Sequence, residues 1–341
     1  MSGLKRLFPS TRVNFPMVIK VLGWLLIVEG CFMLIPLIAS IFSDERPETY
    51  AFGISTAITM ASGILSTVCI HPARTDMGKR EGFLLTAAVW LVFSFFGMLP
   101  FIISPNIPMG ITDGFFEAMS GFTTTGASLI PPDMHIPDAL HLWRYLSQWI
   151  GGMGIILFTL AVLPMLNSSG GMQMFNAEVT GITHDKLRPR ISQTAKGLWA
   201  VYIILTLLCF ACLWAGPMNC FEAGCHAMST LSTGGFSTSA NGIEYWSSTY
   251  IKIILTVFMF LGGVNFSFIF RAATGQFSFL RQSETFMTYL KIIGTSLIIF
   301  SVVILSTGTG SSFVNAIIDP LFQIISIITS TGYTLDAFDS W

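Results

Sequence analysis

Long apolar stretches, separated by short polar segments, dominate the chain. Crossing a hydrocarbon core of about 30 Å takes roughly 20 mostly apolar residues. The pattern predicts seven membrane-spanning helices, at about 21–43, 51–70, 83–103, 146–166, 197–215, 250–270 and 291–307. All seven stretches are too long and too poor in charge to be ordinary core helices. The fold class that we expect is an all-α membrane protein.

Three further apolar segments are too short to cross a membrane, and they share one pattern. They run from Asp113 to Gly126, from Glu222 to Gly235 and from Asp319 to Gly332. Aligned on the last glycine, they match without a gap. Each opens with an acidic residue and closes with a Ser/Thr-rich tetrapeptide that ends in glycine. The helices after the first two also match, since Trp149-Ile-Gly-Gly corresponds to Phe260-Leu-Gly-Gly.

The repeated unit is therefore an outer helix, a re-entrant pore loop and an inner helix. It divides the chain into an N-terminal helix pair (1–82), a first repeat (83–166), a cytoplasmic loop (167–196), a second repeat (197–271), a cytoplasmic linker (272–290) and an incomplete third repeat (291–341). The repeats run parallel, which favours a pore around an axis normal to the membrane. A secondary transporter of an organic solute would bring inverted repeats.

Composition and charge agree with the pattern. Of the residues, 52% are hydrophobic and 10% are charged, whereas a soluble domain carries about 25% charged residues. If the N-terminus is cytoplasmic and the chain alternates sides, all of the 17 Lys and Arg except Arg46, Arg144 and Lys252 fall on the cytoplasmic side. Positively charged loops resist translocation, so this orientation is favoured.

The short segments have the chemistry of cation-selective pore helices. Each helical part is about 15 Å long, half the hydrocarbon depth. Asp113, Glu222 and Asp319 suit helix N-termini, where a carboxylate accepts from free N–H groups. Pro320 strengthens the third case, because proline is tolerated at the first helical position. The negative end of each helix dipole then points at the membrane interior, where it favours a cation.

The closing tetrapeptides can supply the ligands. Backbone carbonyls and Ser/Thr hydroxyls can replace the hydration shell of a cation, and oxygen ligands without carboxylates suit monovalent ions. A residue without a side chain is needed where the loop turns, which explains the position shared by Gly126, Gly235 and Gly332. A single glycine-rich apolar turn would more often be helix-packing chemistry. Three aligned turns favour a pore.

Several polar residues lie within the apolar segments. Glu29 is in the middle of the first span, and we expect it to hydrogen-bond to a neighbouring helix at the periphery, although a proton relay is the alternative. Glu117, His226 and Gln323 occupy one position in the three pore helices. We expect the residue at this position to brace the pore loop from behind.

At this point the chain resembles the Trk/Ktr/HKT superfamily of potassium transporters, and within it the bacterial Trk-type subunits. The resemblance rests on Gly121–Ala127 (GFTTTGA), Ser232–Ser237 (STGGFS), Thr329–Tyr333 (TSTGY) and the polar run 173–196. It implies a pseudo-fourfold pore, and a potassium filter formed by Thr124, Thr125, Gly126, Ala127, Thr233, Gly234, Gly235, Phe236, Ser330, Thr331, Gly332 and Tyr333. In plant members a serine at the first filter glycine accompanies sodium transport, so Gly126 favours potassium.

The resemblance also implies partners and a location. These are a homodimer in the bacterial inner membrane, a cytosolic nucleotide-binding ring subunit (TrkA-like), K⁺ as substrate and no organic cofactor; nucleic acid is not an expected partner. Candidate contacts for the regulator lie in the cytoplasmic segments, at Lys186, Arg188, Arg190 and Arg281. The alternative, equally weighted, is that these cations only fix topology or touch anionic lipid.

Other functions are less well supported. The sequence has no HExxH, GxSxG or comparable catalytic array, so an enzyme is not expected. Uptake of another monovalent cation, such as Na⁺ symport, stays open. Family members have four units and this chain has three, so we expect that it does not conduct selectively by itself. A shortened gene product is the first interpretation, and a pore completed by a second chain is the alternative.

Overall fold

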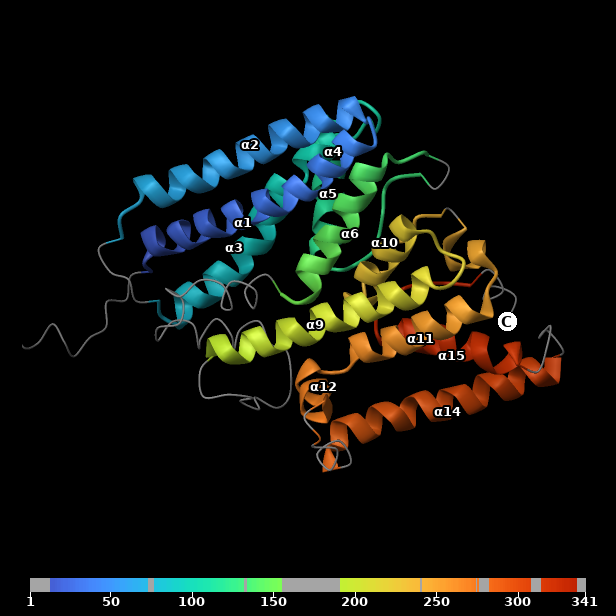
Figure 1. Ribbon diagram of the computed structural model, residues 1–341. Coiled ribbons are helices and arrows are strands. Elements are labelled where there is room, and N and C mark those ends of the chain that lie inside the picture. The colour runs from blue at the N-terminus through green and yellow to red at the C-terminus, as the bar shows by residue number, and fades with distance from the viewer. Residues whose placement is uncertain are drawn as a thin grey trace, which may run out of the picture.

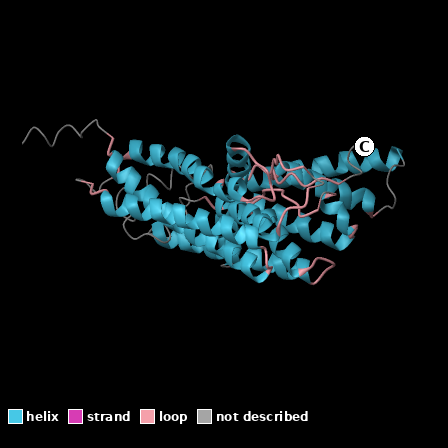
Figure 2. Ribbon diagram, turned by 90° about the horizontal axis from the view of Figure 1, so that it is seen from above, coloured by secondary structure: helices cyan, strands magenta, loops and turns pink. Residues whose placement is uncertain are grey.

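The structure, a computed structural model, describes residues 13–72, 77–131, 134–154, 191–239, 241–273, 275, 282–307 and 314–335. Throughout this part, the secondary structure is helical. Long helices run side by side, and the shorter helices α5, α6 and α10 lie among them near the centre (Figure 1). Seen from above, the helices form an elongated slab (Figure 2).

The first two helices form a hairpin that precedes the repeats. Helix α1 (Phe15–Phe42) and helix α2 (Arg46–Cys69) approach closely where Gly23 faces Gly63. A Cβ on Gly63 would lie only 2.7 Å from the Gly23 carbonyl oxygen. Small residues permit such close helix contact in membrane proteins, where van der Waals packing drives helix association. The sequence-predicted N-terminal helix pair is thus present.

Carboxylates at the α1–α2 turn attach this hairpin to the first repeat. Glu45 accepts hydrogen bonds from the backbone amides of Asp138 (2.9 Å) and Ala139 (3.2 Å), at the start of the next inner helix. Glu48 is buried and accepts from Ser104 Oγ (2.9 Å) and Asn106 Nδ2 (2.7 Å). Free amides at a helix N-terminus favour a carboxylate partner, so the hairpin is held to the repeat at its outer end.

Each repeat contributes an outer helix and a short helix. In the first repeat these are α3 (Lys79–Gly97), continued by α4 (Leu99–Ile103), and α5 (Ile111–Phe122), followed by the inner helix α6 (Asp138–Gly152). In the second they are α9 (Ile191–Trp214) and α10 (Cys220–Leu231), followed by the 3₁₀ helix η3 (Gly242–Trp246) and the inner helix α11 (Thr249–Gly263). The third has α14 (Glu284–Thr307) and α15 (Asn315–Ile328).

Five helices in the described part are long and apolar enough to cross a bilayer: α1, α2, α3 with α4, α9 and α14. The apolar stretch expected at 250–270 is helical but sharply bent rather than one continuous helix. Helix α11 ends at Gly263, and helix α12 (Phe266–Ala273) leaves it at an angle of 104°. The expected span at 146–166 begins earlier, since α6 starts at Asp138, and its continuation beyond residue 154 lies outside the described residues.

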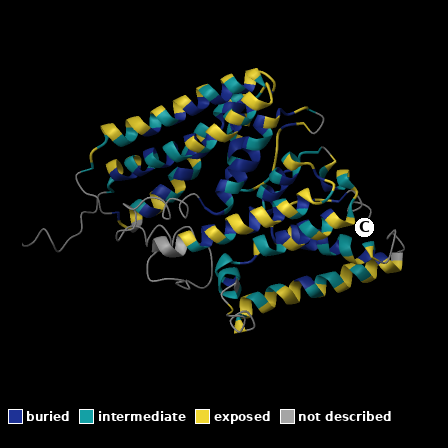
Figure 3. Ribbon diagram, viewed as in Figure 1, coloured by how far each residue is buried: buried dark blue, intermediate teal, exposed yellow. Residues whose placement is uncertain are grey.

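Exposed apolar side chains cover the outward faces of the long helices, and buried residues concentrate at α5, α6 and α10 (Figure 3). In α14 only 11% of the apolar window is buried. A helix apolar on its exposed face is suited to lipid rather than to water.

Glu29 departs from the expectation of a hydrogen-bonded role. It is fully buried in α1, and neither carboxylate oxygen has a hydrogen-bond partner among the described residues. Its nearest neighbours include the end of α3, because a Cβ on Gly97 would lie 3.3 Å from Glu29 Oε1. An unpaired buried carboxyl group is costly unless it is neutral.

Candidate functional site

The three short helices end in the same backbone conformation. Thr124, Thr233 and Ser330 each have φ of 55°, in the left-handed region. Two residues later, the φ values are 76° at Gly126, 77° at Gly235 and 84° at Gly332. The predicted requirement for glycine at this position is therefore confirmed by the backbone angles.

Hydrogen bonds at the end of each short helix explain the left-handed backbone of Thr124, Thr233 and Ser330. The amides of Thr125, Gly234 and Thr331 donate to carbonyls five residues earlier, at 2.9, 2.8 and 2.9 Å. The amides of Thr124, Thr233 and Ser330 donate to carbonyls three residues earlier, at 3.0, 3.2 and 3.0 Å. This pair of bonds is the Schellman motif, which satisfies the last carbonyls of a helix and needs a left-handed residue after the cap.

Glycine usually takes that left-handed position, but here threonine or serine does. A side chain in this conformation costs roughly 1–2 kcal/mol, and such strain often accompanies functional sites. The sequence carried no signal for it beyond the Ser/Thr-rich composition of the tetrapeptides.

The loops also lie against one another. A methyl group built on Gly126 would overlap the Gly234 carbonyl oxygen, and one built on Gly235 would overlap the Thr331 carbonyl oxygen. The first loop therefore contacts the second, and the second contacts the third. A methyl group on Gly332 would meet no described atom within 4 Å.

Serine hydroxyls hold the residue after the glycine in two of the loops. Ser120 Oγ donates to the Ala127 carbonyl oxygen (2.5 Å), and Ser326 Oγ donates to the Tyr333 carbonyl oxygen (2.7 Å). Ser229, at the equivalent position of the second repeat, is buried, but its hydroxyl has no hydrogen-bond partner in the described part of the chain.

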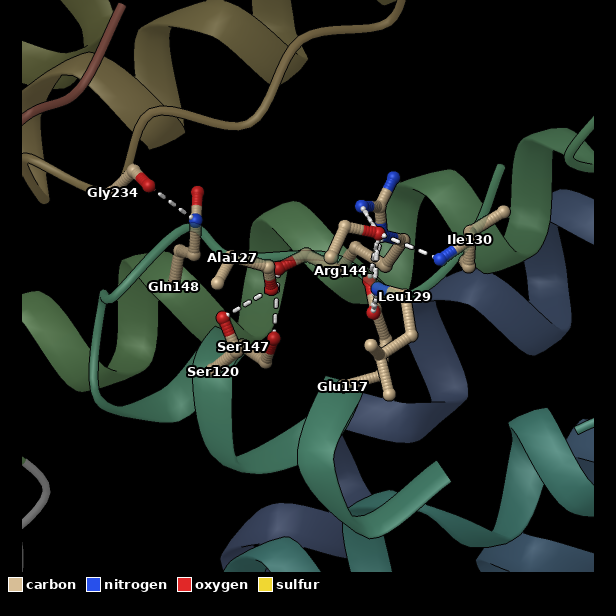
Figure 4. A network of polar contacts seen from close by, with 10 residues as sticks. Glu117, Ser120, Ala127, Leu129, Ile130, Arg144, Ser147, Gln148 and Gly234 are labelled. Carbon is tan, nitrogen blue, oxygen red and sulfur yellow. Dashed lines mark hydrogen bonds and ion pairs between the residues drawn. The ribbon is translucent and has the colours of Figure 1, made fainter. Parts of the chain in front are cut away.

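A buried ion pair supports the first loop from behind (Figure 4). Arg144 of α6 lies 2.8 Å from Glu117 of α5, and the two side chains are 5% and 0% exposed. Glu117 also accepts from the Leu129 amide (3.1 Å) and from Ser128 Oγ (3.0 Å), while Arg144 Nη2 donates to Ser128 Oγ (3.0 Å). The pair is therefore fastened to the chain directly after Gly126 and Ala127.

The same helix face reaches the second loop. The Arg144 guanidinium carbon lies 4.1 Å above the centre of the Phe236 ring. One turn further along α6, Gln148 Nε2 donates to the Gly234 carbonyl oxygen at 2.8 Å, as Figure 4 shows. Gln148 is fully buried, and its Oε1 has no partner within the described residues. Sequence reasoning missed both residues, because Arg144 entered it only as an exception in the charge distribution.

The expected bracing by pore-helix polar residues is confirmed in the first two repeats. His226 is fully buried; its Nδ1 donates to the Glu222 carbonyl oxygen (2.9 Å) and its Nε2 lies 3.4 Å from Ser237 Oγ. Ser237 corresponds to Ser128 of the first loop. In the third repeat, Gln323 is buried and its Oε1 lacks a partner in the described part.

A second ion pair joins the second and third repeats. Lys252 of α11 lies 3.1 Å from Asp319 of α15 and 3.3 Å from Glu244 of η3. These side chains are 12%, 17% and 32% exposed, so the cluster is partly open to its surroundings. It contacts a pore helix and the segment after the second loop.

The acidic residues of the three short helices only partly occupy the N-terminal positions that the sequence predicts for them. Asp113 is in the first turn of α5, but the cap is Gly110 and no side chain caps the helix. Glu222 belongs to a capping box with Asn219. The expectation for Asp319 and Pro320 is wrong: α15 begins four residues earlier, at Asn315, and Pro320 lies within the helix. The Lys252 ion pair gives Asp319 a partner there.

A hollow of about 300 Å³ opens beside the first two loops. Gly126, Gly235 and Phe236 line it together with hydroxyl groups, among them Ser128 and Ser237, and with apolar side chains such as Ile130 and Met134. Lys186, Arg188, Arg190 and Arg281 lie outside the described residues, so the structure does not test the expected regulator contacts.

Comparison with known proteins gives one consistent result. The family model described as "TrkH: Cation transport protein" matches residues 50–341. The Trk system potassium uptake protein TrkH of Escherichia coli K12 is 35% identical over 337 residues, which cover 96% of this chain and 68% of the relative. The chain belongs to the TrkH family of cation transport proteins.

Other family members agree. The Trk system potassium uptake protein TrkI of Halomonas elongata is 32% identical, over 100% of this chain and 68% of its own length. The crystal structure of the potassium transporter TrkH from Vibrio parahaemolyticus superposes with a TM-score of 0.83 at 30% identity, covering 96% of this chain and 67% of that one. Membership of the TrkH family makes this chain a membrane transport protein and not an enzyme.

Proposed function

We propose that this chain forms the pore of a Trk-type potassium uptake system, with K⁺ as its substrate. Dehydrated K⁺ is coordinated at the convergence of the three loops by backbone carbonyls and Ser/Thr oxygens. The ligand-bearing residues are Thr124, Thr125, Gly126, Ala127, Thr233, Gly234, Gly235, Phe236, Ser330, Thr331, Gly332 and Tyr333.

The single observation that carries this proposal is the repeated backbone. In each loop, two residues with a left-handed backbone are separated by one residue that is not left-handed. The pairs are Thr124 and Gly126, Thr233 and Gly235, and Ser330 and Gly332. Three unrelated turns would not share these angles and also lie in contact. A rigid set of carbonyls, held at fixed positions, can replace a hydration shell with the selectivity that a flexible loop would lose.

The helix ends add to this arrangement. Helices α5, α10 and α15 each finish directly before a filter segment, at Phe122, Leu231 and Ile328. The C-terminal end of a helix carries a partial negative charge. Three such ends directed at one place favour a cation there, and they oppose an anion.

The surroundings of Gly332 support a more specific proposal about the pore. Gly126 and Gly235 each pack against the next loop, whereas the corresponding side of Gly332 meets no described atom within 4 Å. We propose that selective conduction needs a fourth loop beside Gly332, which gives the pore its pseudo-fourfold symmetry.

Binding and flux measurements test the two parts separately. Purified protein is heated in KCl, NaCl or choline chloride at equal ionic strength, and K⁺ should raise the unfolding temperature more than Na⁺. Equal stabilisation by all three salts would contradict the potassium site. The same protein in liposomes is then tested with a K⁺-sensitive dye, and the absence of K⁺ entry would contradict the proposed uptake.

The remaining features of the proposal follow from the family. We propose a homodimer in the bacterial inner membrane, with a cytoplasmic N-terminus and a nucleotide-binding regulatory subunit that contacts the segments 167–196 and 272–290. The domain boundaries are those expected from the repeats. Na⁺ symport is the competing function, and stronger stabilisation by Na⁺ than by K⁺ in the heating experiment would favour it.

A further inference from the structure

One face of helix α6 touches two neighbouring loops. Arg144 and Gln148 are four residues apart, so they lie on the same side of the helix. Arg144 reaches the first loop through Glu117 and Ser128, and the second loop through the Phe236 ring. Gln148 reaches the second loop through the Gly234 carbonyl oxygen. We propose that Arg144 and Gln148 are positioning residues that set the separation of the first two loops and thereby determine cation selectivity.

The chemistry of Arg144 suits this role. A guanidinium is planar and has five donors, so it can pair with a carboxylate, donate to a hydroxyl and stack on an aromatic ring at the same time. Here it pairs with Glu117 Oε1 at 2.8 Å, donates to Ser128 Oγ at 3.0 Å and lies 4.1 Å from the Phe236 ring centre. A lysine could hold the charge pair but not all three contacts.

Gln148 fixes the second loop at its filter glycines. Its donated hydrogen bond occupies one lone pair of the Gly234 carbonyl oxygen, which also packs against Gly126. A methyl group on Gly234 would overlap the Gln148 side chain, so the two residues fit without spare room. The Gly234 carbonyl is therefore aimed by α6 and by the first loop. A shift of α6 would move this oxygen relative to Gly126.

Tight burial makes the brace stiff. Glu117, Arg144 and Gln148 are 1%, 5% and 0% exposed. Ion pairs in such surroundings are screened little by salt. A filter discriminates between ions by the spacing and the field of its oxygen ligands. Because a stiff contact between two loops fixes the spacing of their carbonyl oxygens, it affects ion selectivity as well as folding.

The junction between the second and third repeats provides the matched control. Its ion pair, Lys252 with Asp319, links the inner helix of the second repeat to the pore helix of the third, whereas Arg144 and Glu117 join the inner helix and the pore helix of one repeat. Within the described residues, the ion pairs of the Lys252 side chain go to Asp319 and Glu244, which lie in α15 and η3 and not in the three loops. Removing this pair changes the same number of charges without touching the proposed brace.

The test compares three variants with the wild-type chain. Glu117→Gln with Arg144→Met removes the Arg144 part of the brace without leaving a buried charge alone. Arg144→Lys keeps the charge and loses the planar contacts. Lys252→Met with Asp319→Asn is the control. Apparent K⁺ and Na⁺ affinities come from salt-dependent unfolding temperatures, and amide hydrogen exchange is followed in peptides that contain each of the three loops.

We expect the K⁺-over-Na⁺ affinity ratio to fall about tenfold in the first variant, which corresponds to about 1.4 kcal/mol. The fall should be smaller in Arg144→Lys and absent in the control. Exchange should accelerate in the first and second loops and stay unchanged in the third. Uniform acceleration in all three loops, or none, would overturn the brace, because a merely structural role acts through global unfolding.

The inference rests on the proposed function, and the two can fail separately. If the wild-type protein prefers K⁺ and the brace variant keeps that ratio, the selectivity role is wrong and the proposed function stands. If the wild-type protein shows no preference for K⁺, the proposed function is wrong together with the selectivity role. Hydrogen exchange needs no ion, and it still decides whether Arg144 holds the two loops.

Discussion

Two junctions between repeats use the same kind of contact in different surroundings. Between the first and second repeats, Arg144 and Glu117 are buried and touch filter loops on both sides. Between the second and third, Lys252 bridges Asp319 and Glu244 in a partly exposed cluster that touches only helices and a connecting segment. The first junction is thus buried and fixed by several specific contacts, whereas the second is an ion-pair cluster that is partly open to its surroundings.

Energetics sharpens this contrast. Removing one partner of a buried ion pair costs about 3–5 kcal/mol, because the other charge remains buried and unpaired. Exposed pairs contribute roughly 0–1 kcal/mol. We therefore expect the first junction to restrict movement between the first and second loops. The second junction should permit more movement of the third loop.

The largest effect is expected at the filter glycine of the first junction. Gly126→Ala forces a side chain into a left-handed backbone and against the Gly234 carbonyl oxygen. We expect it to abolish K⁺-dependent stabilisation. Gly332→Ala has the same backbone cost, roughly 1–2 kcal/mol, but meets no described neighbour. It should retain a measurable K⁺ effect, and equal loss in the two variants would contradict the contact between loops.

Breaking the buried pair comes next. Arg144→Leu leaves Glu117 without its cation, and we expect a loss of about 3–5 kcal/mol in unfolding free energy. Combining it with Glu117→Leu should recover part of that loss, because no buried charge remains. Denaturant unfolding in detergent measures both variants. A double variant no more stable than Arg144→Leu would show that the pair itself, rather than the orphaned charge, carries the stability.

The second junction should respond weakly. Lys252→Met is expected to cost less than Arg144→Leu, since the two carboxylates left behind are 17% and 32% exposed and Glu117 is not exposed. The cost should shrink further at high salt, because screening weakens interactions between exposed charges. Unfolding at low and high ionic strength tests this. A salt-independent loss of several kcal/mol would show that the two junctions are alike.

The smallest effects compare two equivalent serines. Ser326→Ala removes a hydrogen bond of 2.7 Å to the Tyr333 carbonyl oxygen and should cost about 1 kcal/mol. Ser229→Ala removes a buried hydroxyl that has no partner in the described part of the chain, so it should be neutral or slightly stabilising. Thermal unfolding of the two variants side by side gives the answer, and the reverse order would contradict the assigned hydrogen bonds.

Several parts of the site could be predicted because they depend on local chemistry. The repeat placed glycine where a left-handed backbone follows a short helix, and Gly126, Gly235 and Gly332 have that conformation. Other parts could not. Asp319 precedes Pro320 as a helix start would, yet α15 begins at Asn315. Asp319 lies inside the helix instead, where it pairs with Lys252 from a segment distant in sequence.

The sequence by itself determined the membrane environment, the repeated unit and the positions of the glycines that close its loops. The length of the apolar stretches, the spacing of the repeats and the positions of the glycines can all be read from the order of the residues. Only the tertiary structure decided which residues meet across repeats: Arg144 with Phe236, Gln148 with Gly234, Lys252 with Asp319. These contacts join segments separated by tens of residues. Their partners depend on how whole helices pack, and that is a property of the folded chain as a whole.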